Sequence, residues 1–126
     1  MTGALVWGVK SSFVEYVEAL GEVEVIAPAA RDGDGRFRFP AVGAGGGYAG
    51  AVAFRAHHGA MDVVLRDPRL DGRGLSMEVD DHGHPQSRMV IAHVDEERAA
   101  LAASGAVIFD FRYPPGTELA PVLVES

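Results

Sequence analysis

The chain has 126 residues, which fits a single domain over residues 1–126, and 48% of them are apolar, enough to build a core. It contains no cysteine, which excludes disulfides, thiolate metal sites and a cysteine nucleophile. The net charge of −7, without a dense basic stretch, argues against nucleic acid as a partner.

The sequence has no apolar run near the ~20 residues that a membrane-spanning helix needs. Its first residues, Met1 to Leu5, lack the basic region and apolar segment of a secretory signal. The sequence as written therefore predicts a cytoplasmic protein without a membrane span. If the first residues have been trimmed, we expect the cell surface instead.

A short helix is predicted from Ser12 to Leu20. Ser12 and Glu15 have the spacing of a capping box, in which a hydroxyl and a carboxylate satisfy free backbone N–H groups. Gly21 follows, as a residue that ends a helix would. The segment therefore carries signals for both of its ends.

The predicted helix has an apolar face made of Phe13, Val17 and Leu20 at helical spacing. Ser12 and Tyr16, four residues apart, fall on a flank of that face. This places a hydroxyl and a phenol at the edge of the core, where a pocket could open.

Most of the remaining chain has the patterns of strands. A second helix is predicted over residues 95–104, because Asp95, Glu96 and Glu97 favour a helix N-terminus. The fold class is mainly β, an antiparallel β-sandwich or barrel-like domain with one or two short helices. The strands are predicted over residues 22–27, 36–39, 48–57, 61–66, 75–79, 87–94, 106–111 and 119–124.

Two histidines, His57 and His58, stand at the turn of the predicted hairpin 48–57 and 61–66. Simple alternation sends His58 inward with Phe54 and His57 to the other face, although a bulge near Gly59 could reverse this. A tyrosine oxygen with a histidine beside it is a plausible ligand set for ferric haem. Both histidines stay candidates as partners of Tyr16.

Two other chemistries have weaker support. The loop with Asp80, Asp81, His82 and His84 could bind a divalent metal, but its spacing matches no established zinc site and is typical of a solvated turn. Ser12 with His57 invites a hydrolase interpretation, but no nucleophile-elbow pattern surrounds the serine.

Several short motifs, in one order through nearly the whole chain, resemble the HtaA domain family of actinobacterial haem-uptake proteins. They are Trp7-Gly8-x-Lys10-x-Ser12-Phe13-x-x-Tyr16-Val17, Phe37-x-Phe39-Pro40, Val52-x-Phe54-x-x-His57-x-Gly59-x-Met61-Asp62, Asp67-Pro68-Arg69-Leu70 and Tyr113-Pro114-x-Gly116-Thr117. The chain departs from the family pattern at Val14, where a basic residue is common, and at Ala56, where glycine is usual.

The resemblance implies a β-rich domain that captures, stores or transfers ferric haem without catalytic turnover. It implies Tyr16 as the axial ligand of the haem iron, His57 as its hydrogen-bond partner and Ser12 as a nearby contact, with His58 kept as the alternative partner. A free phenol with a pKa of ~10 is a poor anion at neutral pH, but ferric iron favours the phenolate. The implied partners are haem, other haem-carrier domains or a haem transporter, with a homodimer left open.

Two other functions remain open. A small intracellular enzyme or accessory protein could use the same β-walled pocket for another small molecule. A protein-interaction domain would instead have an exposed apolar patch and no pocket.

Overall fold

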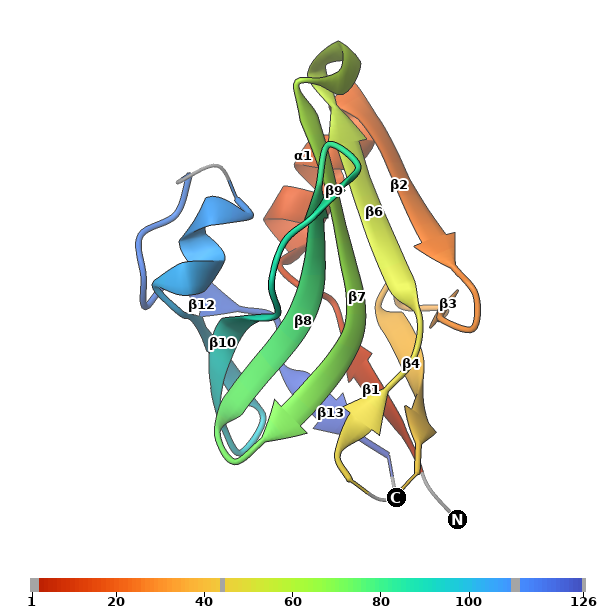
Figure 1. Ribbon diagram of the computed structural model, residues 1–126, viewed down its shortest axis with the longest axis vertical. Coiled ribbons are helices and arrows are strands. Elements are labelled where there is room, and N and C mark those ends of the chain that lie inside the picture. The colour runs from red at the N-terminus through yellow and green to blue at the C-terminus, as the bar shows by residue number, and fades with distance from the viewer. Residues whose placement is uncertain (1–2, 44, 110–111, 126) are drawn as a thin grey trace.

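The computed structural model describes residues 3–43, 45–109 and 112–125 (Figure 1). The helical segments are the α-helix α1 (Ser11–Leu20) and the 3-10 helices η1 (His57–Gly59) and η2 (Ser104–Val107). The strands are β1 (Ala4–Trp7), β2 (Gly21–Ile26), β3 (Ala30–Arg31), β4 (Phe37–Val42), β5 (Gly47–Tyr48), β6 (Ala51–Ala56), β7 (Met61–Asp71), β8 (Gly74–Asp81), β9 (His84–Pro85), β10 (Met89–Asp95), β11 (Arg98–Leu101), β12 (Glu118–Leu119) and β13 (Val122–Val124).

The strands form a curled antiparallel half-barrel. The main order is β12-β11-β10-β8-β7-β5-β4-β1-β13, while β6 pairs with β7 and carries β2 on its other edge. Within this path, strand β4 joins β5 to β1, because residues 41–42 pair with β5 and residues 37–40 pair with β1. The predicted fold class, mainly β and barrel-like with few short helices, is confirmed.

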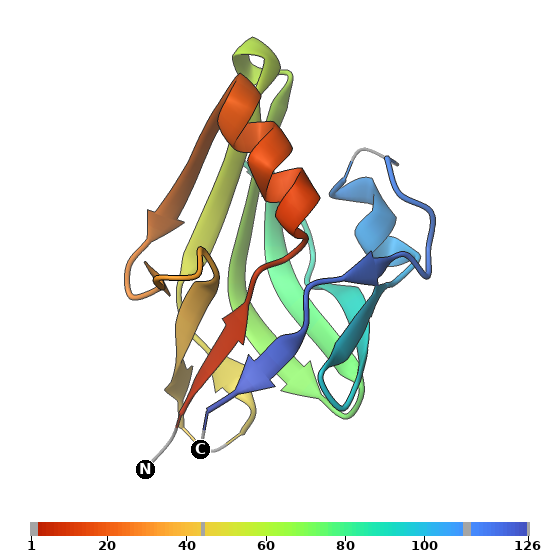
Figure 2. The same cartoon turned by 180° about the vertical axis from the view of Figure 1, so that it is seen from behind.

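The concave face of the half-barrel holds the core. Alternate residues of β7 point inward, among them Met61, Val63 and Leu65, and β8 contributes Leu75 and Met77 in the same way. Helix α1 lies across this face, and η2 lies beside it (Figure 2). The alternation of buried and exposed side chains along the long strands therefore gives the sheet one apolar face, and helix α1 packs against this face.

Strand β1 was not predicted, because its four residues are all buried and show no alternation. It lies between β4 and β13, with Leu5 opposite both Phe39 and Val124. A central strand covered on both faces has a continuous apolar sequence rather than a two-residue period.

The helix predicted over residues 95–104 is wrong. Asp95 ends β10 and pairs with Arg98, the first residue of β11, so the acidic residues form a hairpin turn in which Glu96 has φ 58°. Ala99 and Leu101 are buried with a less buried residue between them. Strand pairing with β10 thus outweighs the helix-favouring composition of the segment.

The strand predicted over residues 106–111 is also wrong where the structure describes it. Successive short-range hydrogen bonds, from Ile108 N to Gly105 O and from Phe109 N to Ala106 O, belong to η2 and the turn after it. Residues 110–111 lie outside the described part of the chain. Gly105 packs so closely on β10 that an added Cβ would lie 2.5 Å from Ile91 O.

Helix α1 differs from its predicted form at its start and on its apolar face. It begins at Ser11 with Lys10 as the N-cap, which makes no side-chain cap hydrogen bond, so the capping box is absent. Leu20 is 48% exposed, and Val14 at 5% joins Phe13 and Val17 in the core instead. Gly21 does end the helix, with an extended φ of −174°, because it also begins β2.

Among residues 3–43, 45–109 and 112–125, no helix has the length and apolar character needed to cross a membrane.

Candidate functional site

Tyr16 is positioned by the packing of α1 on the concave face of the sheet. The Phe13 ring meets the rings of Phe54 and Phe109 edge to face, with centroids 5.2 Å and 4.8 Å apart. These contacts fix the rotation of the helix about its axis. Tyr16, one turn further along the same helix, is left half-buried at the border of the core.

His57 comes to Tyr16 from the turn between β6 and β7. Tyr16 Oη and His57 Nε2 lie 2.6 Å apart, and the two ring centroids are 5.7 Å apart. The hydrogen bond joins residues 41 positions apart in the chain. The structure therefore brings together the phenol and one of the two histidines that the sequence singled out.

The strand alternation that favoured His58 fails because β6 ends at Ala56. His57 and His58 both have left-handed backbone angles, with φ of 56° and 54°, and Gly59 follows with φ 93°. Side chains in such a turn no longer alternate between the faces of a sheet. A left-handed turn, rather than the suggested bulge, aims His57 at Tyr16.

Arg112 is the second partner of the tyrosine oxygen and was missed in the sequence. Its Nη2 donates to Tyr16 Oη at 2.6 Å, and its guanidinium carbon lies 4.1 Å from the centroid of the Tyr16 ring. The two residues are 96 positions apart, and no local pattern around Arg112 points to the helix. Its place directly before the Tyr113-Pro114 motif is the one sequence signal that could have drawn attention to it.

The chemistry of these three groups limits the hydrogen bonds of the Tyr16 oxygen. An arginine only donates hydrogen bonds, so the phenol oxygen accepts from Arg112. It donates to His57 Nε2 when that nitrogen carries no proton and accepts from it when it does. If the phenol loses its proton, the resulting oxygen anion can accept from both groups, and charge-assisted hydrogen bonds of this kind are the stronger ones. The arrangement is suited to an anionic tyrosine oxygen.

The other predicted contacts lie further from this oxygen. Ser12 is exposed at the start of α1, and within the described residues no hydrogen bond involves its hydroxyl. His58 borders a separate shallow hollow with Leu20, Glu22 and Arg55. Neither residue is joined to Tyr16 as His57 and Arg112 are.

Val14 and Ala56, which depart from the family pattern, both have core positions. Val14 is 5% exposed and Ala56 is 3% exposed. Ala56 pairs with Met61 and with Gly21 at the last register position of β6. In this structure both side chains therefore contribute to the packing of the core.

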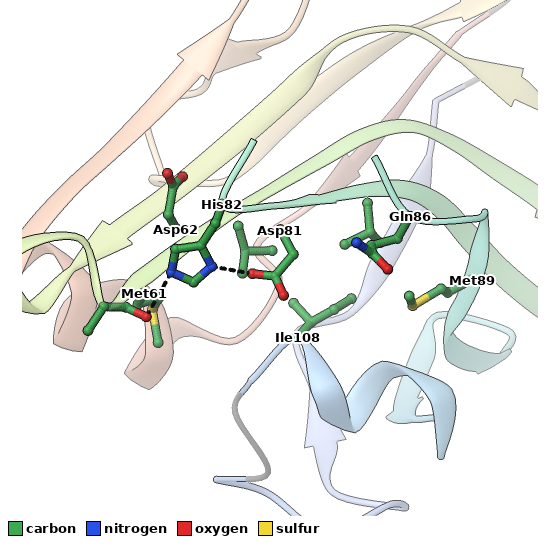
Figure 3. Close-up of a pocket in the computed structure, with 10 residues that line it drawn as sticks. Met61, Asp62, Asp81, His82, Gln86, Met89 and Ile108 are labelled. Atoms are coloured by element: carbon green, nitrogen blue, oxygen red, sulfur yellow. Dashed lines mark hydrogen bonds and ion pairs between the residues drawn. The ribbon is translucent and has the colours of Figure 1, made fainter. Parts of the chain in front are cut away.

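A cavity of about 210 Å³ opens on the concave face beside the site (Figure 3). One side of the cavity is lined by Ala60, which follows His57 by three residues in the chain. Another side is lined by Ile108, which precedes Arg112 by four residues. Tyr16 lies outside its lining, but the two segments that supply the partners of Tyr16 border it. Its apolar lining comes from Met61, Val63, Val79, Met89 and Ile108, and its polar lining from Asp62, Asp81, His82 and Gln86.

The loop considered as a metal site has a different arrangement. His82 Nδ1 lies 2.7 Å from Asp81 Oδ1, and His84 Nδ1 bonds the backbone oxygen of His82. Within the residues that the structure describes, no three histidine, aspartate or glutamate side chains are grouped to hold a metal ion. The loop is a turn with hydrogen bonds among its own residues.

The family model and the solved structures that match this chain indicate the same family. Among curated proteins, none matches this chain. Three solved structures from Corynebacterium glutamicum share its fold, and each is covered over at least 91% of its own chain. The heme binding protein HtaB is 19% identical over 98% of this chain, with 91% of its own chain covered and a TM-score of 0.80.

The other two are domains of HtaA. The N-terminal domain is 20% identical over 97% of this chain, with 94% of its own chain covered and a TM-score of 0.76. The C-terminal domain is 24% identical over 96%, with 93% covered and a TM-score of 0.70. The HtaA family model, described as Htaa, matches residues 2–125, and the chain therefore belongs to the HtaA domain family.

Proposed function

We propose that this domain binds ferric haem through Tyr16 and takes it up and passes it on without catalytic turnover. The observation that carries the proposal is the tyrosine oxygen held between His57 Nε2 and Arg112 Nη2, each at 2.6 Å. The family membership and the likeness to a heme binding protein of the same fold support it. Tyrosine is an established axial ligand of haem iron.

The donor set fits the proposed group. An anionic oxygen is a hard ligand that suits ferric iron, and when bound, the iron would supply the charge that favours the phenolate. His57 would receive the phenolic proton or share it, and Arg112 would donate to the oxygen throughout. These two residues would thereby orient Tyr16 and offset its negative charge.

The neighbouring cavity fits the apolar face of a porphyrin, though only in part. Met61, Val79 and Met89 offer flexible and branched apolar surface. The volume of about 210 Å³ is below the roughly 300–1,000 Å³ of ordinary ligand pockets. Haem binding would therefore require this cavity to widen.

Exposure of the site supports a role in transfer. His57 and Arg112 are both exposed in the described structure. A ligand oxygen at the border of the core can be reached from outside without unfolding the sheet. We therefore expect bound haem to exchange with an acceptor protein.

The test is a hemin titration of the purified protein followed by absorbance. Tyr16→Phe keeps the ring and removes only the oxygen, so we expect a changed Soret band and at least about tenfold weaker binding. Tyr48→Phe, on β5 away from α1, is the matched control and should titrate as the unaltered protein does. An unchanged spectrum and affinity in Tyr16→Phe would remove the proposed ligand.

A further inference from the structure

The turn between β8 and β9 places His82 against the turn that carries His57. His82 and Gly83 have left-handed backbone angles, φ 52° and 80°, as a tight two-residue hairpin turn requires. The backbone N–H of His82 donates to Asp62 O at 2.7 Å, which anchors the turn to the start of β7. In Figure 3 the His82 ring lies between the Asp81 carboxylate and the chain beside Met61.

Among the described residues, the hydrogen-bond partners of the His82 ring are all acceptors. Nδ1 lies 2.7 Å from Asp81 Oδ1, while Nε2 lies 3.0 Å from Gly59 O and 3.1 Å from Ala60 O. A neutral imidazole donates from one nitrogen only, whereas the protonated ring donates from both. The full set of hydrogen bonds therefore requires the imidazolium form.

The carbonyl groups that His82 holds belong to a strained turn. His57 and His58 have φ of 56° and 54°, a region that residues other than glycine rarely occupy and that has an energetic cost. Within the turn itself, the backbone N–H of Ala60 donates to His57 O at 3.1 Å. The His82 ring adds a tether from a different hairpin, to the two residues that complete the turn.

We propose that protonated His82 is a positioning residue, which holds the η1 turn in its strained form and thereby keeps His57 against Tyr16. As a consequence, haem retention depends on pH through a side chain that is remote from the ligand oxygen. This rests on the proposed function of Tyr16. The second and third hydrogen-bond partners of the ring are on the turn that carries His57, and none is on α1. His82 therefore acts through His57.

The sign of the pH effect follows from the groups that face the ring. The Asp81 carboxylate, by its hydrogen bond, raises the pKa of His82 above the usual value, and the carbonyls of Gly59 and Ala60 act in the same direction. Two other titratable groups lie next to His82. The backbone oxygen of Asp62 accepts from the His82 N–H, and the Asp62 carboxylate lies 3.5 Å from Arg55 Nε. His84 Nδ1 bonds the backbone oxygen of His82. The hydrogen bonds of protonated His82 to Asp81, Gly59 and Ala60 are fully present below the usual histidine pKa of about 6.5. They are lost as the pH rises through the raised pKa of His82.

The experiment measures the rate of haem loss to an excess of apomyoglobin between pH 5.5 and pH 9, in the unaltered protein, His82→Ala and Asp81→Asn. The unaltered protein should lose haem about threefold faster or more above the transition, a smaller effect than the tenfold typical of groups that contact a metal ligand directly. His82→Ala should lose haem at the faster rate, without this transition. Asp81→Asn should shift the transition to lower pH, and His93→Gln, exposed on β10, is the control that should follow the unaltered protein.

A second measurement on the haem-free protein separates this proposal from that for Tyr16. The NMR signals of the His57 ring report its hydrogen bond to Tyr16 without any haem. We expect these signals to change in His82→Ala and, in the unaltered protein, to follow the titration of His82. His57 signals and haem-loss profiles that are the same in His82→Ala and the unaltered protein would overturn the proposal, even if haem binding is established.

Discussion

Replacing Arg112 with glutamine tests the part of the site that the sequence did not predict. The change removes a charged donor that lies 2.6 Å from Tyr16 Oη and a guanidinium that lies 4.1 Å from the ring centroid. Glutamine keeps a polar side chain of moderate length but cannot offset a negative oxygen. We expect Arg112→Gln to weaken hemin binding and to alter the Soret band.

The size of the effect follows from the geometry and the exposure of the pair. Hydrogen bonds to charged groups contribute about 1.5–3 kcal/mol, and solvent screening at an exposed site favours the low end. We therefore expect a loss of about 1.4 kcal/mol, which is about tenfold in Kd. Arg112→Lys should be intermediate, because it keeps the charge and loses the planar group over the Tyr16 ring.

A double-mutant cycle with His57→Ala sharpens the test. Both side chains bond the same oxygen, so each can partly compensate for the loss of the other. The double variant should therefore lose more affinity than the sum of the single losses, by about 0.5 kcal/mol or more.

Hemin titrations of the four proteins, with Arg98→Gln on β11 as a matched control, measure this coupling. Arg112→Gln with the affinity and spectrum of Arg98→Gln would refute the role of Arg112.

The remaining predictions concern the histidine turn and the scaffold. His57→Ala should change the haem spectrum and His58→Ala should leave it unaltered, because of the two histidines only His57 bonds Tyr16. Hemin titration followed by absorbance measures this, and equal effects of the two variants would reject His57 as the partner of Tyr16. Gly21→Ala should lower the free energy of unfolding by about 3 kcal/mol or more, since its Cβ would lie 1.9 Å from Arg55 O, whereas Gly33→Ala, with open space around it, should be nearly neutral in urea denaturation. Phe13→Ala should cost about 3–5 kcal/mol in the same assay, because the ring is 1% exposed and packs on Phe54 and Phe109; a loss below about 1 kcal/mol would mean that α1 is held by other contacts.

The pattern of apolar and polar residues predicted those strands in which buried and exposed side chains alternate along the chain. Strands β7 and β8 alternate between a buried and a more exposed face, and a two-residue period shows this directly. Patterns failed where burial is uniform, as in β1, or where pairing outweighs composition, as in β11. The physical reason is that pairing partners distant in the sequence, such as β13 for β1, leave no local signal.

For the site, the sequence by itself determined that a phenol stands at the edge of a helix and that histidines stand at a hairpin turn. The HtaA motifs identified the family and singled out Tyr16 with His57. Only the tertiary structure decided that His57 rather than His58 reaches the phenol, because the choice depends on backbone angles in a turn and not on strand alternation. It alone brought in Arg112 and His82, since hydrogen bonds between segments 20 to 100 residues apart form only once the sheet has curled around the helix.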